Sequence, residues 1–466
     1  MDLKRLLTEF PTLELSTLLT DEQAITLAKT LYAQISALQV SLKDLQAQKR
    51  ELNAQFKLAK GDQQKLALLK AQSKSQSLAI KEKESELREH GLNLQALFEV
   101  HQHKEEIWPP ERFSTITRNT SSNNISVIEA TDADASRWNH YVNDHPQASA
   151  YHDYQWRSVI DLSFNHQSFY LVAESENKQV MGVLPLTWLN SKLFGSFSAS
   201  VPYFNYGGAL ADNSNIEQSL LRAALALSKK LGWEHIEYRT CKEGLDLPSV
   251  SHKASMILPL PDTEEGLDKA LGAKVRAQYR QSEQAQPATH FGGTELLDQF
   301  YEVFAQNMRD LGTPVYSKAF FRSILTTFPE QAKIIVITVD GSPAAVGFLL
   351  GYGEILEIPW ASTLRKFNKY SINMWMYRQI LGYAIDKKYN YFDFGRSSID
   401  AGTYKFKKQW GAKPIQHYWY YQLADGKALP QLNPNNPKYK LAISVWQKLP
   451  VWVTKIIGPP LVKYLP

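Results

Sequence analysis

Two carboxylates in this sequence occupy positions at which acid–base chemistry is possible. Glu357 interrupts an otherwise apolar strand expected over residues 355–361. Burial disfavours the charged form of a carboxylate and raises its pKa, so Glu357 could accept a proton near neutral pH; an outward-facing position on an edge strand is the alternative. Asp310 lies between Arg309 and a turn that contains Thr313. It is a second candidate base, or else one half of an ion pair that anchors the turn.

Two further sets of polar side chains could bind a substrate. Asp393 and Arg396 end a strand expected over residues 391–394 and enter a loop. Charged residues at a strand end commonly face a cleft, although these two could equally pair with each other. The second set precedes the glycines at 207 and 208 and consists of Tyr203, Asn205 and Tyr206. This segment is either a substrate-binding loop or a tight turn with packed aromatic rings.

Thiol and metal chemistry have little support in the sequence. Cys241 is the only cysteine, so no internal disulfide can form, and no neighbouring His–Asp arrangement would activate it as a nucleophile. We expect a buried, inert thiol. His101 and His103 could bind a metal only with distant partners, and surface histidines at a helix end are the simpler interpretation. We therefore expect neither a metal nor a tightly bound cofactor.

The elements that position these residues belong to a long chain. With 466 residues, of which 44% are hydrophobic, two or three domains with real cores are expected. The net charge of +5 is too small to imply nucleic-acid binding without a local concentration of charge. The first ten residues carry four charged side chains and no apolar core of signal-peptide length, and no stretch of about 18 apolar residues occurs. These features predict a soluble, cytoplasmic protein.

Residues 20–105, which follow an N-terminal segment at 1–19, predict an antiparallel helical hairpin. This stretch contains no proline, and apolar residues recur at alternating spacings of four and three from Leu31 to Phe56, with Lys49 filling one position. Such spacing is typical of a coiled-coil seam. A break at Gly61 and Asp62 separates this helix from a second one with a weaker seam.

Basic side chains gather around the tip of the predicted hairpin. The hairpin could serve as a dimerisation element, which would make the protein a homodimer, or only as a spacer. The basic side chains at the tip include Lys49, Arg50, Lys57, Lys60 and Lys65.

Alternating strands and helices follow a linker at residues 106–124. The same order of a helix, a strand pair, a strand, a helix and a strand occurs twice, which suggests a duplicated unit spanning 125–262 and 263–425. In the second unit, Asp340 and Gly341 stand between two apolar runs, a strong signal for a β-hairpin turn. The tail, residues 426–466, ends in an amphipathic stretch too often broken by proline to cross a bilayer. We expect it to dock on the protein; lying on a membrane surface is the alternative.

Several strings in the C-terminal half resemble those of a known family. They are Asn307–Pro314, Ile358–Ser362, Asn373–Tyr377, Phe392–Ser397 and Gly402–Gly411. Together they resemble FemAB-like proteins found with exosortase (PEP-CTERM) and exopolysaccharide loci, and more broadly the Fem peptidyltransferases and GNAT acyltransferases. The resemblance covers about residues 125–466. It implies an α+β fold, with two tandem GNAT-like domains behind the hairpin.

The resemblance also implies a function and site residues. The expected reaction moves an aminoacyl or acyl group onto an amine of a cell-envelope or exopolysaccharide precursor. Fem proteins place a lysine at the position of Lys407, beside Phe406, where it stabilises negative charge; a solvated run formed with Lys405 and Lys408 is the alternative. In GNAT enzymes, a glutamate near the strand that corresponds to that of Glu357 often acts as the base. Further substrate-binding candidates on these strings are Arg309, Thr313, Trp360, Ser362, Asn373, Asp393, Arg396 and Tyr404.

The donor is the least determined part of this expectation. The hairpin resembles the tRNA-binding arm of seryl-tRNA synthetases, which implies that the five basic residues named at its tip bind tRNA. Fem transferases carry such an arm within their second domain rather than at the N-terminus. Residues 365–371 occupy the place of the GNAT pyrophosphate turn but contain no glycine. This favours an aminoacyl-tRNA or carrier-protein donor over acyl-CoA. A non-catalytic GNAT-fold binding protein is the competing class. The expected location is the cytoplasm; a position at the inner face of the membrane is the alternative.

Overall fold

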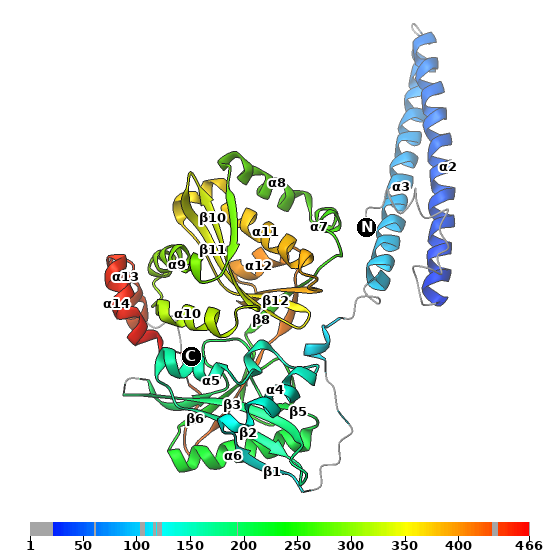
Figure 1. Cartoon of the computed structure of the whole chain (residues 1–466). Helices are drawn as coiled ribbons and strands as arrows, with labels where there is room; N and C mark the ends of the chain where they lie inside the picture. Colours follow the sequence, from blue (N-terminus) through cyan, green and yellow to red (C-terminus); the bar gives the residue numbers. More distant parts are fainter. Residues whose placement is uncertain are drawn as a thin grey trace. The chain divides into compact units, whose positions relative to one another are not determined.

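The computed structural model describes residues 22–59, 62–102, 108–114, 118, 124–192, 194–430 and 437–465. The chain divides into two compact units, the first ending at Trp108 and the second beginning at Pro109 (Figure 1). None of the described helices is long and apolar enough to cross a membrane.

The first unit contains two long helices, α2 (Glu22–Leu58) and α3 (Gln63–Gln102). Leu31 and Ile35, early in α2, share a buried cluster with Leu94, late in α3. Leu52 and Leu69, which flank the connection, share another. The helices are therefore antiparallel, and the expected hairpin is confirmed.

The basic residues of the hairpin differ in exposure. Lys49 is half-buried at its predicted position between the helices, whereas Arg50 and Lys65 are exposed. Lys60 and the side chain of Lys57 lie outside the described residues. At least two of the five predicted contacts are therefore free to meet a ligand.

The first sheet of the second unit follows the order β1-β2-β3-β4-β6-β15-β7, with β5 beside β3. Its strands are β1 (Ser126–Glu129), β2 (Ser168–Glu174), β3 (Val180–Ser191), β4 (Gly195–Ala199), β5 (Leu210–Ala211), β6 (His235–Thr240), β7 (Ser249–Val250) and β15 (Tyr418–Leu423). The accompanying helices are α4 (Ala135–Asp144), α5 (Trp156–Phe164) and α6 (Ser214–Leu231).

The second sheet follows the order β14-β8-β13-β12-β11-β10-β9. Its strands are β8 (Lys253–Pro259), β9 (Ala288–Gly292), β10 (Ala332–Val339), β11 (Ser342–Tyr352), β12 (Ile355–Thr363), β13 (Tyr391–Ser398) and β14 (Lys413–Gln416). Its helices are α7 (Glu264–Ala270), α8 (Ala273–Ser282), α9 (Leu297–Leu311), α10 (Lys318–Thr327), α11 (Ile372–Asp386) and α12 (Gly402–Lys408).

The predicted turn between β10 and β11 is confirmed. Asp340 and Gly341 have φ of 49° and 70°, the two positive values that a type I′ hairpin turn requires.

The two sheets exchange strands. β8 precedes residue 262 in sequence but lies in the second sheet, between β13 and β14. β15 comes from the end of the second half and pairs with β6 in the first sheet. Each sheet thus holds a strand from the other side of the boundary expected near residue 262, and this ties the two halves into one unit.

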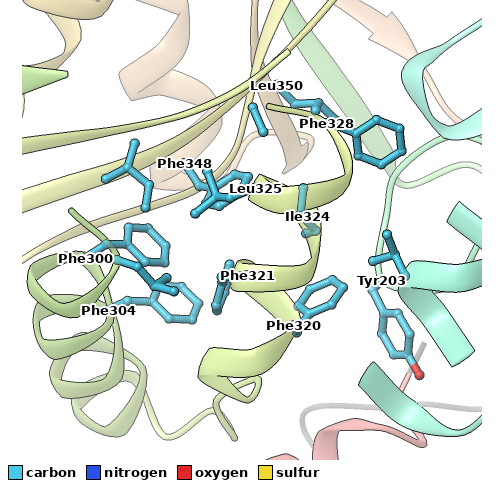
Figure 2. Close-up of a cluster of buried hydrophobic side chains, with 14 of the residues drawn as sticks. Tyr203, Phe300, Phe304, Phe320, Phe321, Ile324, Leu325, Phe328, Phe348 and Leu350 are labelled. Carbon is cyan, nitrogen blue, oxygen red and sulfur yellow. The ribbon is translucent and has the colours of Figure 1, made fainter. Parts of the chain in front are cut away.

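One of the large buried clusters also spans both halves. Figure 2 shows Phe300 and Phe304 of α9 facing the phenylalanines of α10, with Phe348 of β11 nearby and Tyr203 of the first half on the other side. Aromatic rings bury large areas in close-packed arrangements, so this cluster holds the loop around Tyr203 firmly against the second half.

The C-terminal tail forms α13 (Pro437–Trp446) and α14 (Val451–Val462). α14 buries Thr454, Gly458 and Val462, and a Cβ on Gly458 would come within 2.9 Å of the backbone nitrogen of Val315. This close approach needs a residue without a side chain. The tail therefore docks on the second unit, as expected.

Candidate active site between the two sheets

Two buried carboxylates stand side by side where two strands separate. Glu357 of β12 pairs in register with Asp393 of β13, and their side chains are 3% and 0% exposed. The parallel pairing ends at this pair, although β12 continues to Thr363 and β13 to Ser398. Because residues in register on neighbouring strands point to the same face, the two carboxylates share one environment.

The surroundings of Glu357 favour its protonated form. Burial and the neighbouring Asp393 raise the pKa of Glu357 to about 8. The Tyr151 hydroxyl donates to Oε2 at 2.9 Å, and the Asn205 amide donates to Oε1 at 3.4 Å. Glu357 lies on a central strand, so the edge position considered from the sequence is wrong. A carboxyl group with this pKa can exchange a proton near neutral pH.

Asp393 has stronger hydrogen-bond support. The Tyr206 hydroxyl donates to Oδ2 at 2.6 Å, and the Gly395 amide donates to Oδ1 at 2.7 Å. Burial raises the pKa of Asp393, while these two hydrogen bonds and the charge of Arg112 oppose the rise. Since the two carboxylates are coupled, the first negative charge on the pair disfavours the second.

A chain of polar groups extends from this pair. The Tyr206 hydroxyl also contacts the hydroxyl of Ser255, which lies 3.0 Å from His417 Nε2. Burial and nearby arginines lower the pKa of His417 to about 3, so its ring is neutral at pH 7. Tyr206, Ser255 and His417 therefore form a hydrogen-bonded chain that ends at Asp393. Because the His417 ring is neutral, this chain brings no positive charge to the carboxylate.

Lys407 contacts the backbone of β13 beyond the point where the pairing with β12 ends. Its ammonium group donates to the carbonyl oxygens of Gly395 at 2.8 Å and Arg396 at 3.1 Å, just beyond the point where β12 and β13 separate. Burial lowers the pKa of Lys407 to about 8, although the charge of Asp393 opposes this. Lys405 and Lys408 are exposed. Lys407 is therefore not part of a solvated basic run.

The loop at residues 201–208 brings Asn205 and Tyr206 to the carboxylates. Val201 and Tyr203 have φ of 50° and 77°, a region that non-glycine residues rarely adopt. Gly207 has φ of 139°, and a Cβ there would come within 2.8 Å of Val201. Such strain is held only where surrounding contacts enforce it, and it often marks a functional segment.

Arg112 supplies a positive charge that the sequence gave no reason to expect. It belongs to the segment interpreted as a linker, where a short turn, η3 (Glu111–Phe113), places its guanidinium 4.2 Å from the ring centroid of Tyr206. Its charge lowers the pKa of both Glu357 and Asp393 against the effect of burial. No spacing pattern links residue 112 to the distant strands β12 and β13.

A pocket of about 330 Å³ lies beside Tyr206. Arg112, Gly207, Gly208 and Cys241 also line it. Burial raises the pKa of the Cys241 thiol, which fits the expected inert thiol. Because Tyr206 both lines the pocket and bonds Asp393, it connects a solvent-accessible recess to the buried pair.

Two arginines from different sheets meet at one indole. The guanidinium carbons of Arg239 (β6) and Arg396 (β13) each lie 4.6 Å from the ring centroid of Trp419. Arg239 is 1% exposed and bonds Glu237 at 2.7 Å and the carbonyl of Phe204 at 2.7 Å, whereas its Nη2 has no partner among the described residues.

Among the described residues, the positive charge of Arg396 is balanced by fewer acidic partners than that of Arg239. Arg396 is exposed and forms no ion pair within the described part of the chain, so its alternative pairing with Asp393 is not observed. Desolvation of the guanidinium group, which lies over the Trp419 ring, and the charge of Arg239 lower the pKa of Arg396 to about 10. An anionic group would relieve this repulsion. Sequence reasoning missed Arg239 and Trp419, which only the strand exchange brings to Arg396.

Three of the residues predicted from the sequence, Arg309, Asp310 and Tyr203, lie at the docked tail instead. Asp310 pairs with Arg309 at 2.9 Å, and Arg309 donates to the carbonyl oxygens of Gln447 and Leu449. Thr313 is exposed just after α9, and the Tyr203 hydroxyl donates to the carbonyl of Lys463 at 2.6 Å. The anchoring ion pair considered for Asp310 is thus observed, away from the carboxylate pair.

The other predicted substrate-binding residues lie on strands and helices of the second half of the chain. Trp360 packs against Phe204 and Phe320, and Ser362 accepts a hydrogen bond from Asn307 at 3.0 Å. The remaining three are half-buried: Asn373 in the first turn of α11, and Tyr404 and Phe406 on α12. Within the described residues, no group of three or more His, Cys, Asp or Glu side chains could hold a metal ion.

Comparison with known proteins places an acetyltransferase-type domain around this site. Residues 271–408 match the family model described as an acetyltransferase (GNAT) domain, a segment that includes Glu357, Asp393 and Lys407. No curated protein sequence matches the chain. The fold is α+β, with two helices followed by two mixed sheets of tandem GNAT-like domains.

Solved structures with a similar course of the chain are distant in sequence. FemX is 15% identical, with 68% of this chain and 100% of that chain covered at a TM-score of 0.49. A tandem GNAT protein from the clavulanic acid biosynthesis pathway, without AcCoA, is 13% identical, with 66% and 100% covered at 0.43. L-PGS from Bacillus licheniformis is 11% identical, with 74% and 99% covered at 0.42.

Proposed function

We propose that this chain is a FemAB-like transferase that moves an aminoacyl or acyl group onto an amine. The observation that carries the proposal is the buried pair of Glu357 and Asp393 at the separation of β12 and β13, inside the segment that matches a GNAT domain. Acyl transfer to an amine needs a base whose pKa lies near the working pH, and Glu357 meets this need.

Glu357 acts as the base in the proposed reaction. The acceptor nitrogen attacks the acyl carbonyl carbon and forms the new C–N bond. Glu357 accepts the proton that the nitrogen loses, directly or through one water. The bond from the acyl carbon to the donor oxygen or sulfur then breaks, and the leaving atom takes the proton from Glu357, which returns to its carboxylate form. Tyr151 and Asn205 hold the carboxylate in one orientation through both oxygens.

Lys407 places positive charge near the reacting centre. Two hydrogen bonds to carbonyl oxygens of β13 hold its ammonium group in place. A fixed positive charge in a site with little water stabilises the negative charge that develops on the acyl oxygen. Those two carbonyl contacts also favour a second candidate, a non-catalytic GNAT-fold binding protein in which Lys407 only stabilises the loop.

An anionic acceptor fits the arginines beside this site. Arg396 has no acidic partner in the described residues, and Arg239 has an unpartnered Nη2. Two guanidinium groups bind phosphate or carboxylate with well-defined geometry. Cell-envelope and exopolysaccharide precursors carry such groups, which supports a precursor of this class as the acceptor.

Aminoacyl-tRNA is the donor that we favour. Arg50 and Lys65 are exposed near the end of the hairpin and could contact phosphates. The segment before α11 is a short turn, η8 (Arg365–Tyr370), without glycine, so side chains occupy the place where a GNAT domain binds pyrophosphate. Acyl-carrier protein and acyl-CoA are the alternative donors.

The test is transfer of a labelled group to hydroxylamine, a small amine surrogate, from bulk aminoacyl-tRNA, acyl-CoA or acyl-carrier protein. We expect one donor to react, and Glu357→Gln to lower kcat about 100-fold or more while the circular dichroism spectrum is unchanged. Glu330→Gln, an exposed glutamate, is the matched control. Failure of all three donors, or equal rates for the two variants, would favour the binding protein.

A further inference from the structure

The docked helix α14 leaves an apolar face uncovered. Thr454 and Val462, on its docked face, are 1% and 5% exposed, whereas Trp452 and Ile456 are 66% and 64% exposed. At 100° per residue, positions 452 and 456 lie on the side of the helix opposite to 454 and 458. Docking on the protein therefore does not account for the most apolar residues of this helix.

Other exposed apolar residues belong to the same two helices. We define the tail surface as Val445 of α13 together with Trp452, Ile456 and Ile457 of α14, all of which are exposed. Single exposed apolar residues are ordinary in soluble proteins, but several on one helix pair mark a surface that binds something. Leaving such side chains in water is unfavourable in proportion to their apolar area.

The charges around the tail surface indicate what covers it. Residues 437–466 contain five lysines and no aspartate or glutamate. Lys455 faces a pocket that Glu302 and Asp310 also line, but Lys448 is exposed and Lys463 is half-buried. A second copy of the chain would bring lysines opposite lysines in a symmetric contact, which is unfavourable.

We propose that the tail surface binds the surface of an anionic lipid bilayer. An interfacial helix combines exposed aromatic and aliphatic residues with lysines and lies in the plane of the membrane. The composition of α14 matches this description. Tryptophan favours the boundary between headgroups and acyl chains. Neither α13 nor α14 is long enough to span the bilayer, so the contact is peripheral.

The docked helix is bonded directly to the loop of the candidate active site. The carbonyl oxygen of Lys463 accepts hydrogen bonds from the Tyr203 hydroxyl at 2.6 Å and from His166 Nε2 at 2.7 Å. Tyr203 belongs to the loop that carries Asn205 and Tyr206. Bilayer binding through α14 would thus hold the carboxylate pair in a fixed orientation to the membrane. The binding itself does not depend on the proposed transferase activity.

Co-sedimentation of the full chain with vesicles tests this proposal. The probes are vesicles of phosphatidylcholine alone and of phosphatidylcholine with phosphatidylglycerol. We expect binding to the anionic vesicles that Trp452→Ser with Ile456→Ser weakens about tenfold or more, since two apolar side chains no longer insert. The matched control is Leu68→Ser with Leu78→Ser, which removes two residues 62% and 61% exposed on α3.

The outcomes separate the alternatives. Binding that the control retains and the tail variant loses supports the proposal. Absence of wild-type binding, equal binding of both variants, or equal binding to neutral vesicles overturns it. Sedimentation velocity adds a further check: a wild-type dimer that the tail variant converts to a monomer, without vesicle binding, would make this surface an interface between two copies.

Discussion

The Tyr206 hydroxyl donates to Asp393 at 2.6 Å, although 187 residues separate them in the chain. Tyr206 comes from the first half and Asp393 from the second, so this hydrogen bond exists only because the two halves pack as one unit. It supports Asp393 as the better stabilised carboxylate of the pair. Glu357, which receives weaker help from Tyr151 and Asn205, is left as the proton acceptor with a pKa of about 8.

The pH dependence of transfer should follow Glu357. Because only its ionised form is a base and its pKa is about 8, kcat/KM should rise about tenfold per pH unit between about pH 6 and pH 7.5. Above pH 8, loss of the Lys407 charge should lower the rate, since the pKa of Lys407 is also about 8. Hydroxylamine is suitable as the acceptor because it is already neutral over most of this range. A flat profile would exclude Glu357 as the base.

Glu357 should also make the folded state less stable as the pH rises. The pKa of Glu357 is about 8 in the folded protein, whereas an unperturbed glutamate has a pKa of 4.5. Between these two pH values the folded protein therefore binds more protons than the unfolded protein. The free energy of unfolding should therefore fall from about pH 5 to pH 8. Glu357→Gln removes this pH dependence. Between pH 5 and pH 8 its free energy of unfolding should therefore increase by about 2–4 kcal/mol relative to that of the wild-type protein.

Urea unfolding at both ends of that range measures this difference. Glutamine changes hydrogen bonding equally at the two pH values, so only the change between them reports the titration. Glu330→Gln, at an exposed position, should leave the pH dependence unaltered. A parallel shift of the wild-type and Glu357→Gln curves would show that Glu357 does not titrate in this range.

Replacing Lys407 should separate its charge from its packing. Lys407→Met removes both bonds to the carbonyls of Gly395 and Arg396, and we expect kcat to fall about 100-fold with a stability loss of about 1–3 kcal/mol. Lys407→Arg keeps the charge and should restore part of kcat. Lys405→Met changes an exposed lysine on the same helix and is the control. Full activity of Lys407→Met would leave Lys407 with a structural role only.

The hairpin should provide most of any tRNA affinity. Arg50→Glu with Lys65→Glu reverses two exposed charges near the tip, and we expect bulk tRNA to bind about tenfold more weakly, with a smaller dependence on salt. Lys81→Glu with Arg88→Glu makes the same charge change at exposed positions further along α3. A filter-binding series over salt concentration measures both variants.

Preference for serine tRNA would further support the aminoacyl-tRNA donor. Equal weakening by both variants would point to unspecific charge attraction. If the wild-type protein does not bind tRNA at low salt, the hairpin becomes an oligomerisation or spacer element, and carrier-protein or acyl-CoA donors remain.

Local spacing was sufficient to predict several elements of this protein. The seam from Leu31 to Phe56 and the turn at Asp340 and Gly341 depend on residues close in sequence, whose side-chain period or backbone angles select one structure. Glu357 was recognisable as a candidate base because a carboxylate within an apolar strand is unusual wherever that strand lies.

Only the tertiary structure decided which residues meet. Asp393, Arg112 and Tyr206 reach Glu357 from separate parts of the chain, and Arg239 reaches Arg396 because β15 returns to the first sheet with Trp419. The tertiary structure also placed Asp310 at the tail, away from the carboxylate pair. Periodicity within one segment carries no information about such partners, since contacts between distant segments depend on how whole sheets pack and exchange strands.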